Sequence, residues 1–434
     1  MKPETPAARD DWIDELCAAQ CPGYSLDQAF YRNPDIFERD VERVLGNHWM
    51  LAGHSSQIPA AGDFFLFDVG GESIILVRGA GGAIHAHYNV CRHRGSRVLL
   101  ECAGHATVLT CRYHGWSYTP DGALRAASHM PPDFEPRKHG LIPCHVQVLE
   151  GLIFISLARD APELGAIAEG VAPFLRLHGT ARARVAERRI FPLHANWKLA
   201  VENYLECYHC RVAHPEYCRV EIKVDRIGDS TSAAQARFDA RFRAWRARAE
   251  ELGTALPDFG TELPLDERLP RAQFGAAYRA PLREKFLSAT DDGQPAAPLM
   301  GGFTGYDGGE TALAIGPFTY MLAANDYAVF FQFVPRDAVR SDMIVTWLVD
   351  GSAREGKDYD LARLTWLWTV TTEQDKSIIE ANAAGVSSRR YAPGPPSLLE
   401  GDVAGFRAWY LALVGAPDRL RSLPRRGGAR YFAM

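Results

Sequence analysis

The sequence predicts an α+β protein with an all-β domain first and an antiparallel sheet backed by helices second. Three observations support this prediction. The 434 residues exceed the usual size of a single core. Short apolar or alternating runs, separated by Gly, Pro and Asp turns, fill the region from about residue 49 to residue 157. Beyond it, helical periodicity and strand-like runs both occur, which is typical of a sheet covered by helices.

The first half of the chain divides into a helical segment and the all-β domain. Residues 11 to 50 carry apolar positions among charges at helical spacing. We place the boundaries at 1–48 for an N-terminal helical segment that packs on the second domain, 49–160 for the all-β domain and 161–434 for the second domain. The expected strands of the all-β domain are Phe64–Val69, Ser73–Val77, Val108–Cys111 and Gly151–Leu157.

The second domain is expected to begin with a linking segment that contains a helix, at residues 160 to 185. Pro-rich and Gly-rich loops are expected after the next helices, up to about Gly309. The remaining elements are a strand followed by a helix in Arg189–Arg219, a helix in 235–252, strands at Thr319–Leu322, Ala328–Val334 and Met343–Val349, and a helix over Tyr359–Ala383.

Composition excludes several classes of function. The net charge of −5 gives no reason to expect a nucleic acid, and the arginine-rich end is expected to be a solvated terminus. No run of some 18 apolar residues predicts a membrane span, and the N-terminus lacks a signal pattern, so we expect a cytoplasmic protein. Nine cysteines over this length are not a secreted disulfide scaffold. In a reducing compartment, clustered Cys and His indicate metal.

The first such cluster is Cys91-Arg92-His93, then seventeen residues, then Cys111-Arg112-Tyr113-His114. Each half contributes one thiolate and one imidazole. In a [2Fe–2S] centre the cysteines would bind one iron and the histidines the other, and neutral imidazole in place of thiolate raises the reduction potential. Gly95 and Gly115 permit tight loops next to a metal. The alternative is a structural zinc site, although zinc fingers usually pair Cys-x2–4-Cys with His-x3–5-His.

The second cluster lies between Asn196 and Pro215 and contains Glu206, His209 and His214. We expect Glu206 and His209 to share a helical face, and Pro215 to stop that helix. Two histidines and one distant carboxylate would form a facial triad that leaves positions open on Fe(II) for O2. The candidate carboxylates lie on the late helix: Asp375, Glu373 and Glu380. On residue type alone, each of these is as well explained as a solvated acid.

Cys207 and Cys210 flank His209 as a Cys-x2-Cys pair. Such a pair can bind zinc or act as a redox pair. No partner pair follows nearby, so the sequence favours neither role.

Together the two clusters resemble the α subunits of Rieske oxygenases over roughly residues 25 to 412, and most closely the branch that acts on quaternary ammonium compounds, such as glycine betaine monooxygenase. The stretches that carry the resemblance are Asn89–Arg97, Cys111–Trp116, Asn196–Glu216 and, later, Gln374-Asp375, Asn382, Gly385-Val386, Ser388-Arg389 and Pro393-Gly394-Pro395. The segment from Asp258 to Asp307 and the arginine-rich tail are hard to match.

The resemblance implies a Rieske [2Fe–2S] domain and a catalytic domain of the helix-grip type. It implies Asp375 as the third ligand of a mononuclear Fe(II), with Asn203 close to that iron. It also implies a homotrimer, in which Glu206 links His114 of one subunit to His209 of the next. Because the chain has no Gly-x-Gly-x-x-Gly signature, NAD(P)H would be oxidised by a separate flavin and ferredoxin-type reductase.

The resulting functional hypothesis is an O2-dependent hydroxylation of an N-methyl group that releases formaldehyde. A quaternary ammonium has no donors, so aromatic faces must recognise it. Candidate rings are Tyr204, Phe303, Tyr306, Phe318, Tyr320 and Trp347. Three alternatives stay open: hydroxylation of an aromatic acid or another small carboxylate, a plain Rieske electron carrier, and a zinc-stabilised binding module.

Overall fold

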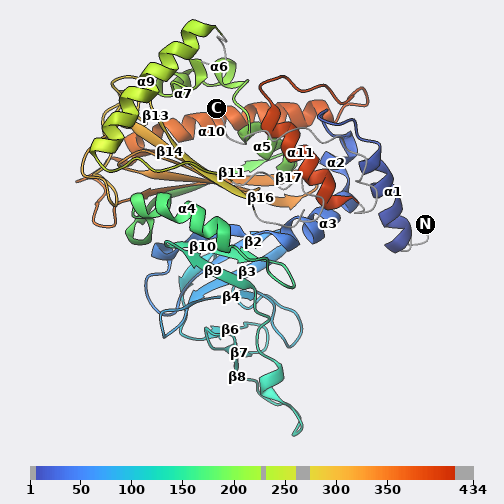
Figure 1. Ribbon diagram of the computed structural model, residues 1–434. Helices are drawn as coiled ribbons and strands as arrows, with labels where there is room; N and C mark the ends of the chain where they lie inside the picture. The colour runs from blue at the N-terminus through green and yellow to red at the C-terminus, as the bar shows by residue number, and fades with distance from the viewer. Residues whose placement is uncertain (1–5, 226–230, 261–273, 416–434) are drawn as a thin grey trace.

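The computed structural model describes residues 6–225, 231–260 and 274–415 (Figure 1). The arginine-rich tail and part of the segment between Asp258 and Asp307 lie outside the described residues. The α-helices are α1 (Pro6–Ala18), α2 (Gln28–Arg32), α3 (Pro34–Arg43), α4 (Gly165–Leu177), α5 (Trp197–Tyr204), α6 (Cys210–Ala213), α7 (Pro215–Val220), α9 (Ser232–Glu251), α10 (Leu361–Val386) and α11 (Gly401–Val414).

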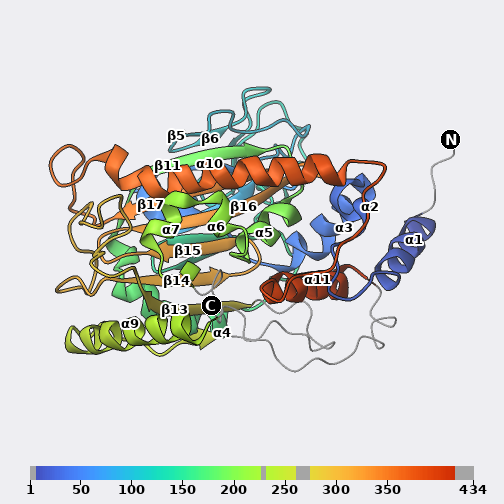
Figure 2. The ribbon, with the colours of Figure 1, turned by 90° about the horizontal axis from the view of Figure 1, so that it is seen from above.

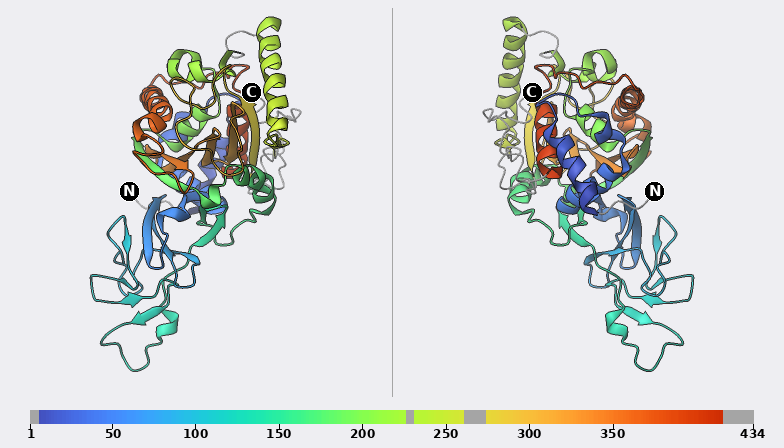
Figure 3. Two further views of the ribbon diagram at one scale, coloured as in Figure 1. Left: turned by 90° about the vertical axis from the view of Figure 1, so that its left-hand side faces the viewer. Right: turned by 90° about the vertical axis from the view of Figure 1, so that its right-hand side faces the viewer.

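The first domain consists of three small antiparallel sheets. They have the strand orders β1-β10-β9, β4-β3-β2-β5 and β6-β7-β8. The strands are β1 (Met50–His54), β2 (Asp63–Val69), β3 (Glu72–Arg78), β4 (Ile84–Tyr88), β5 (Ala103–His105), β6 (Leu109–Thr110), β7 (Ser117–Tyr118), β8 (Leu124–Ala126), β9 (His145–Leu149) and β10 (Leu152–Ser156). Figure 3 shows this domain projecting from the rest of the chain, with the short sheet of β6 to β8 in its outer part.

The second domain is built on one seven-stranded antiparallel sheet in the order β11-β17-β16-β15-β14-β13-β12. Its strands are β11 (Arg184–Leu193), β12 (Phe259–Gly260), β13 (Gly275–Pro281), β14 (Gly309–Ile315), β15 (Thr319–Ala323), β16 (Ala328–Asp337) and β17 (Arg340–Val349). In Figure 2, α10 runs across the sheet on the β11 side and α9 lies beside β13. Most residues of β15, β16 and β17 are buried, so the core of this domain lies at the centre of the sheet.

Helix α5, which leads into the second cluster of the sequence, is fixed by buried polar contacts with both ends of the chain. Lys198 pairs with Asp40 of α3, and Glu202 pairs with Arg407 of α11 at 2.7 Å. The Tyr31 hydroxyl donates to Glu202 at 2.9 Å. Breaking one partner of a buried ion pair leaves an uncompensated charge, which costs about 3–5 kcal/mol. The packing of the N-terminal helices therefore helps to position α5.

Most of the expected elements form, but two expectations about the second domain are wrong. The region up to Gly309 is not only loop, since it contains β13, in which five of seven residues are Gly, Ala or Pro, residue types that are depleted in strands. Pairing with β14 over seven residue pairs makes it a strand. The predicted helix of Arg189–Arg219 is divided into α5, α6 and α7, and Pro215 begins α7 rather than only ending a helix. Proline suits the first turn of a helix because it lacks an N–H.

None of the described helices combines the length and the apolar character that crossing a bilayer requires.

Candidate metal centres

The first donor cluster lies on two loops of matching backbone geometry. The N–H of Cys91 donates to the Ser96 carbonyl, and that of Gly95 donates back to the Cys91 carbonyl at 3.0 Å. The second loop repeats this pattern with Cys111, Gly115 and Trp116. Gly95 and Gly115 have φ angles of 78° and 72°, which side chains rarely adopt, and a Cβ at either would meet nothing within 4 Å. Backbone conformation, not space, therefore requires these glycines.

The four donors of this site differ in exposure. The Cys91 and Cys111 sulfurs are free and buried, whereas His93 and His114 are exposed, with ring centroids 4.6 Å apart. Trp116 stacks on His93 at 4.9 Å. Slight desolvation, together with the neighbouring His93 and Arg94, lowers the pKa of His114 and favours the neutral ring that a metal requires. Two buried thiols and two exposed imidazoles fit the donor set of a Rieske cluster.

Tyr118 supports the thiol side of this site. Its hydroxyl lies 3.3 Å from the Cys91 sulfur and accepts a hydrogen bond from the Arg92 N–H at 3.0 Å. Because the backbone N–H is the donor, the hydroxyl proton is free to point at the sulfur. Tyr118 was not predicted as part of this site, since only the fold brings β7 against the first loop.

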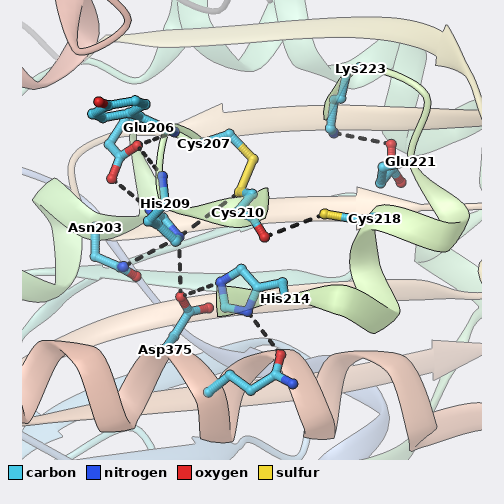
Figure 4. The surroundings of a disulfide bond; sticks show 12 residues. Asn203, Glu206, Cys207, His209, Cys210, His214, Cys218, Glu221, Lys223 and Asp375 are labelled. Atoms are coloured by element: carbon cyan, nitrogen blue, oxygen red, sulfur yellow. Dashed lines mark hydrogen bonds and ion pairs between the residues drawn. A yellow bond between two sulfur atoms is a disulfide. The ribbon is translucent and has the colours of Figure 1, made fainter. Parts of the chain in front are cut away.

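The second donor cluster brings together residues from three parts of the second domain (Figure 4). His209 lies in the turn before α6, His214 lies between α6 and α7, and Asp375 projects from α10. The Asp375 Oδ1 lies 3.0 Å from Nε2 of His214 and 3.5 Å from Nε2 of His209. By contrast, Glu373 is exposed, and Glu380 accepts a hydrogen bond from the His194 N–H. Geometry therefore separates Asp375 from the two other acids.

Cys210 also brings its sulfur within 4.8 Å of the donor nitrogens of His209 and His214. It is, however, joined to Cys207 in a disulfide. A disulfide sulfur is not the thiolate that binds metals. The three groups that remain, two imidazoles and one carboxylate, fit the facial triad of a mononuclear iron.

Each histidine of this site is oriented by an oxygen on its other ring nitrogen. The Oε1 of Glu206 lies 2.5 Å from Nδ1 of His209, and the Oε1 of Gln374 lies 2.9 Å from Nδ1 of His214. Such acceptors hold the proton on Nδ1 and leave Nε2 for a metal. Asn203, expected close to the iron, has its amide nitrogen 3.5 Å from Nε2 of His209. Sequence reasoning assigned no role to Gln374.

The expected reason for the Glu206–His209 contact is wrong, because no helix joins the two residues. Both lie between α5 and α6, where the Oε2 of Glu206 accepts hydrogen bonds from the N–H groups of Tyr208 and His209. Glu206 thus holds both the backbone of this turn and the imidazole ring of His209.

Electrostatics reinforce the convergence at this site. Burial lowers the pKa of His209, but the hydrogen bonds that its ring donates to Asp375 and Glu206 more than offset this and raise it to about 9. Burial opposes ionisation of Asp375, yet hydrogen bonds with His209 and His214 hold its pKa below the usual range. A cation binding between these groups would take the place of the proton that His209 holds.

A cavity opens from the second site toward the sheet. Alongside Asp375, His209 and His214, it is lined by Tyr204, Tyr217, Tyr278, Tyr320, Phe331, Phe333 and Trp368, among others. Of the rings proposed from the sequence, Tyr204 and Tyr320 line it. Four others do not: Phe303 packs on His178, Tyr306 donates to the Ala297 carbonyl, Phe318 packs on Trp197, and Trp347 is buried in β17. Trp347 lies on β17 with its side chain buried away from the cavity, whereas Phe303, Tyr306 and Phe318 lie in loops outside the strands.

The chain carries one donor set on an all-β domain and another on the helices that cover an antiparallel sheet. The chemistry of these two sets defines a class of protein with a Rieske cluster and a separate mononuclear iron. The Rieske [2Fe-2S] domain family matches residues 48–147, and the catalytic domain of the ring-hydroxylating α subunit family matches residues 180–416.

Comparison with individual proteins agrees. The chain is 35% identical over 392 residues to the glycine betaine monooxygenase oxygenase subunit of Pseudomonas aeruginosa strain UCBPP-PA14, covering 89% of this chain and 88% of the relative. It is 34% identical over 222 residues to the carnitine monooxygenase oxygenase subunit of Escherichia coli strain K12, covering 49% and 58%. A crystal structure of the quaternary ammonium Rieske monooxygenase CntA has the same fold, with a TM-score of 0.68, 21% identity and coverage of 93% and 98%.

The chain therefore belongs to the ring-hydroxylating α subunits of Rieske oxygenases. It is an oxidoreductase whose cofactors are a [2Fe–2S] cluster and a mononuclear iron, and an oxygenase subunit of this kind receives its electrons from a reductase partner.

Proposed function

We propose that the chain is the terminal oxygenase of a two-component system that uses O2 and NAD(P)H to remove an N-methyl group from a quaternary ammonium compound. The observation that carries this proposal is the convergence of His209, His214 and Asp375 at a cavity lined by aromatic rings. Relatives named for glycine betaine and carnitine support the substrate class.

The cluster ligands in this proposal are Cys91, His93, Cys111 and His114. Support comes from the matching loops and from the free, buried sulfurs beneath paired imidazoles. The zinc alternative is less consistent with the Cys-x-His and Cys-x2-His spacing and with the match of this domain to the Rieske [2Fe-2S] family.

The iron ligands in this proposal are His209, His214 and Asp375. Glu206 and Gln374 would fix the imidazole tautomers, so that both Nε2 atoms face the carboxylate. When bound, the iron supplies the activation of O2. The aromatic lining would exclude water from the reacting carbon and hold the substrate's methyl group toward the ligands.

We further propose that electrons cross between subunits of a homotrimer, from His114 of one copy through Glu206 to His209 of the next. The exposure of His93 and His114 supports this route, as does the projection of the domain that carries them from the rest of the chain (Figure 3). The N–H of Tyr208 donates to Glu206, and the side chains of Tyr208 and of Val212 in α6 are 56% and 91% exposed. Exposed apolar side chains near a carboxylate that contacts a histidine of its own subunit would suit docking by another copy of the chain.

The reaction balances as follows. A methyl C–H bond is replaced by C–O with one atom of O2. The second oxygen atom leaves as water with two electrons from NAD(P)H and two protons. The N-hydroxymethyl cation then breaks its C–N bond, and the electron pair stays on nitrogen as formaldehyde and one proton depart. Aromatic rings such as Tyr204, Tyr320 and Trp368 would hold the fixed cation, each by about 0.5–2 kcal/mol.

The test is a panel of glycine betaine, carnitine, proline betaine and several aromatic acids, each incubated with the iron-loaded protein, a generic reductase and NADH. We expect formaldehyde in step with NADH consumption for at least one betaine. Hydroxylated aromatic product without formaldehyde would instead support an aromatic-acid hydroxylase. An iron content of two per chain and no turnover of any compound would support a plain electron carrier.

A further inference from the structure

The cavity contains one charged side chain that the metal site does not use. Among the lining residues, the charged groups are Glu206, Asp375 and Lys223, besides the two histidines. Glu206 and Asp375 contact His209 and His214. Lys223 follows α7, and its side chain is only 10% exposed. A buried ammonium at the wall of a substrate cavity requires an explanation, because desolvating it is costly.

Two carboxylates behind the cavity hold Lys223 in its charged form. Its Nζ lies 3.5 Å from Oε2 of Glu221 and 3.4 Å from Oε1 of Glu310. Burial lowers the pKa of Lys223, but Glu221 above all, with Glu310 and neighbouring tyrosines, keeps it well above its usual range. Burial and the nearby Glu221 raise the pKa of Glu310 to about 8, so Glu221 is the stronger partner of the ammonium.

The contacts of Lys223 with the two carboxylates are loose. Both are longer than the 2.7–2.9 Å of a charge-assisted hydrogen bond. The side chain of Tyr217 is a third hydrogen-bond partner of Lys223, and Glu221 and Glu310 also hydrogen-bond to each other. Neither acid lines the cavity, whereas Lys223 does. The face of the cluster that meets a ligand is therefore cationic.

Tyr217 connects this end of the cavity with the metal site. Its ring centroid lies 5.7 Å from Nζ of Lys223 and 6.3 Å from the ring centroid of His214. Figure 4 shows Lys223 and Glu221 set apart from Asp375, on the opposite side of His209 and His214. One tyrosine ring thus separates the cation from the metal site, a span that a small molecule with two charged ends can bridge.

We propose that Lys223 binds the carboxylate of the substrate, so that the cavity selects molecules that carry a carboxylate at the end remote from the iron. This inference rests on the proposed function for the quaternary ammonium at the other end. The ammonium of Lys223 repels a second cation and attracts an anion, which sets the direction of a zwitterion: methyl groups toward His214 and Asp375, carboxylate toward Lys223.

The test compares ligands that differ only at this end. Glycine betaine and choline share a trimethylammonium, but only the first has a carboxylate. Isothermal titration of the iron-loaded, oxidised protein is expected to show tighter binding of glycine betaine. Removing Lys223 alone would leave Glu221 charged and buried, which can unfold the chain. The variant is therefore Lys223→Met combined with Glu221→Gln, with Glu221→Gln alone as the control.

We expect the double variant to lose roughly 10- to 100-fold in affinity for glycine betaine, the scale of a hydrogen-bonded charge contact. Choline binding should stay within about threefold of wild type, and the single Glu221→Gln variant should keep its preference for the carboxylate. If Lys223 had only a structural role, the double variant would bind both ligands more weakly, and by the same factor. An unchanged ratio between the two ligands in the double variant would overturn the inference, as would equal binding of both ligands by the wild type.

Formaldehyde release separates this inference from the proposed function. If a betaine is demethylated and the double variant does so with an unchanged KM, the role of Lys223 is wrong and the function stands. If no betaine reacts, the proposed function fails, and the comparison is repeated with benzoate and benzamide. A preference for the acid that disappears in the double variant would support Lys223. A preference that persists, or no binding of any acid or betaine by the wild type, would overturn its assignment.

Discussion

The two donor sets of this chain are built in opposite ways. The cluster site consists of two neighbouring loops fixed by their own backbone hydrogen bonds, and its histidines are exposed at a projecting surface. The second site draws His209, His214 and Asp375 from distant elements, and its ring orientations depend on side chains such as Glu206 and Gln374. The first construction suits passing electrons outward, and the second suits reactions from which water must be excluded.

Because of this difference, the two sites are vulnerable to different substitutions. The backbone hydrogen bonds of the cluster loops join residues only four or five positions apart, so substitutions elsewhere in the chain should hardly affect that site. The second site depends on the packing of α5 and α10, and α5 is fixed by buried ion pairs with α3 and α11. Substitutions can therefore test whether the two sites form independently, how electrons pass between them and what sets the reduction potential of the cluster.

The largest expected effect follows from removing the carboxylate of the second site. Asp375→Ala should lower the turnover rate roughly 1,000-fold or more, because a catalytic metal contributes several kcal/mol of transition-state stabilisation. The protein should keep both cluster irons and lose the third. Iron analysis and visible spectra measure this. Glu373→Ala, an exposed acid two residues earlier on the same helix, is the matched control and should keep all three irons.

The reverse variant completes the comparison. Cys91→Ser should lose the cluster and its colour while retaining the mononuclear iron. If each variant loses both metal centres, the two sites do not form independently of each other, and this prediction is wrong.

The second prediction concerns the route between the sites. Neither Asp375→Ala nor Cys91→Ser is expected to turn over alone, but co-expressed in equal amounts they should restore roughly one quarter of wild-type activity per chain. This fraction follows if each working unit needs an intact iron site in one subunit and an intact cluster in a given neighbour of a closed ring. A mixed assembly that remains inactive would place electron transfer within single chains.

The third prediction addresses Glu206, the carboxylate that contacts His209. Glu206→Gln should keep the iron but slow its reduction by the cluster, with a loss of about 10- to 100-fold in activity, as for other groups that orient a metal ligand. Stopped-flow spectra would separate a slow step between the centres from slow reduction of the cluster. Glu373→Gln is the control for charge. Equal rates in the two variants would exclude Glu206 from the route.

The same contrast explains how much the sequence could predict. The four cluster donors lie close in sequence, and their spacing with Gly95 and Gly115 indicates the loops directly. For the second site, His209 and His214 are near in sequence, but three acids on α10 were equivalent until resemblance to a family favoured one of them. Only the assembled sheet and helix exclude Glu373 and Glu380 by geometry.

Contacts across the fold were not predictable. The role of Gln374 depends on how α10 lies against α7, and the position of Lys223 in the cavity depends on strands far along the chain. Four of the six candidate rings do not line the cavity, because aromatic character does not tell where a loop such as that of Phe303 and Tyr306 will lie, or which face of a strand a ring such as Trp347 occupies. The strand β13 was missed because its stability comes from pairing with β14 rather than from its own residues.

The smallest effect is expected at Tyr118, on the cluster side of the comparison. Its hydroxyl lies 3.3 Å from the Cys91 sulfur, and a hydrogen bond to a cluster sulfur stabilises the reduced, more negative state. Tyr118→Phe should therefore make the reduction potential more negative, by roughly some tens of millivolts, the scale of one hydrogen bond. Redox titration of the visible spectrum measures this shift. Tyr113→Phe, an exposed ring beside His114, is the control and should leave the potential unchanged. Because the second site shares no contact with Tyr118, its iron content should not change. A variant that instead loses the mononuclear iron would show that the two centres are coupled through the fold.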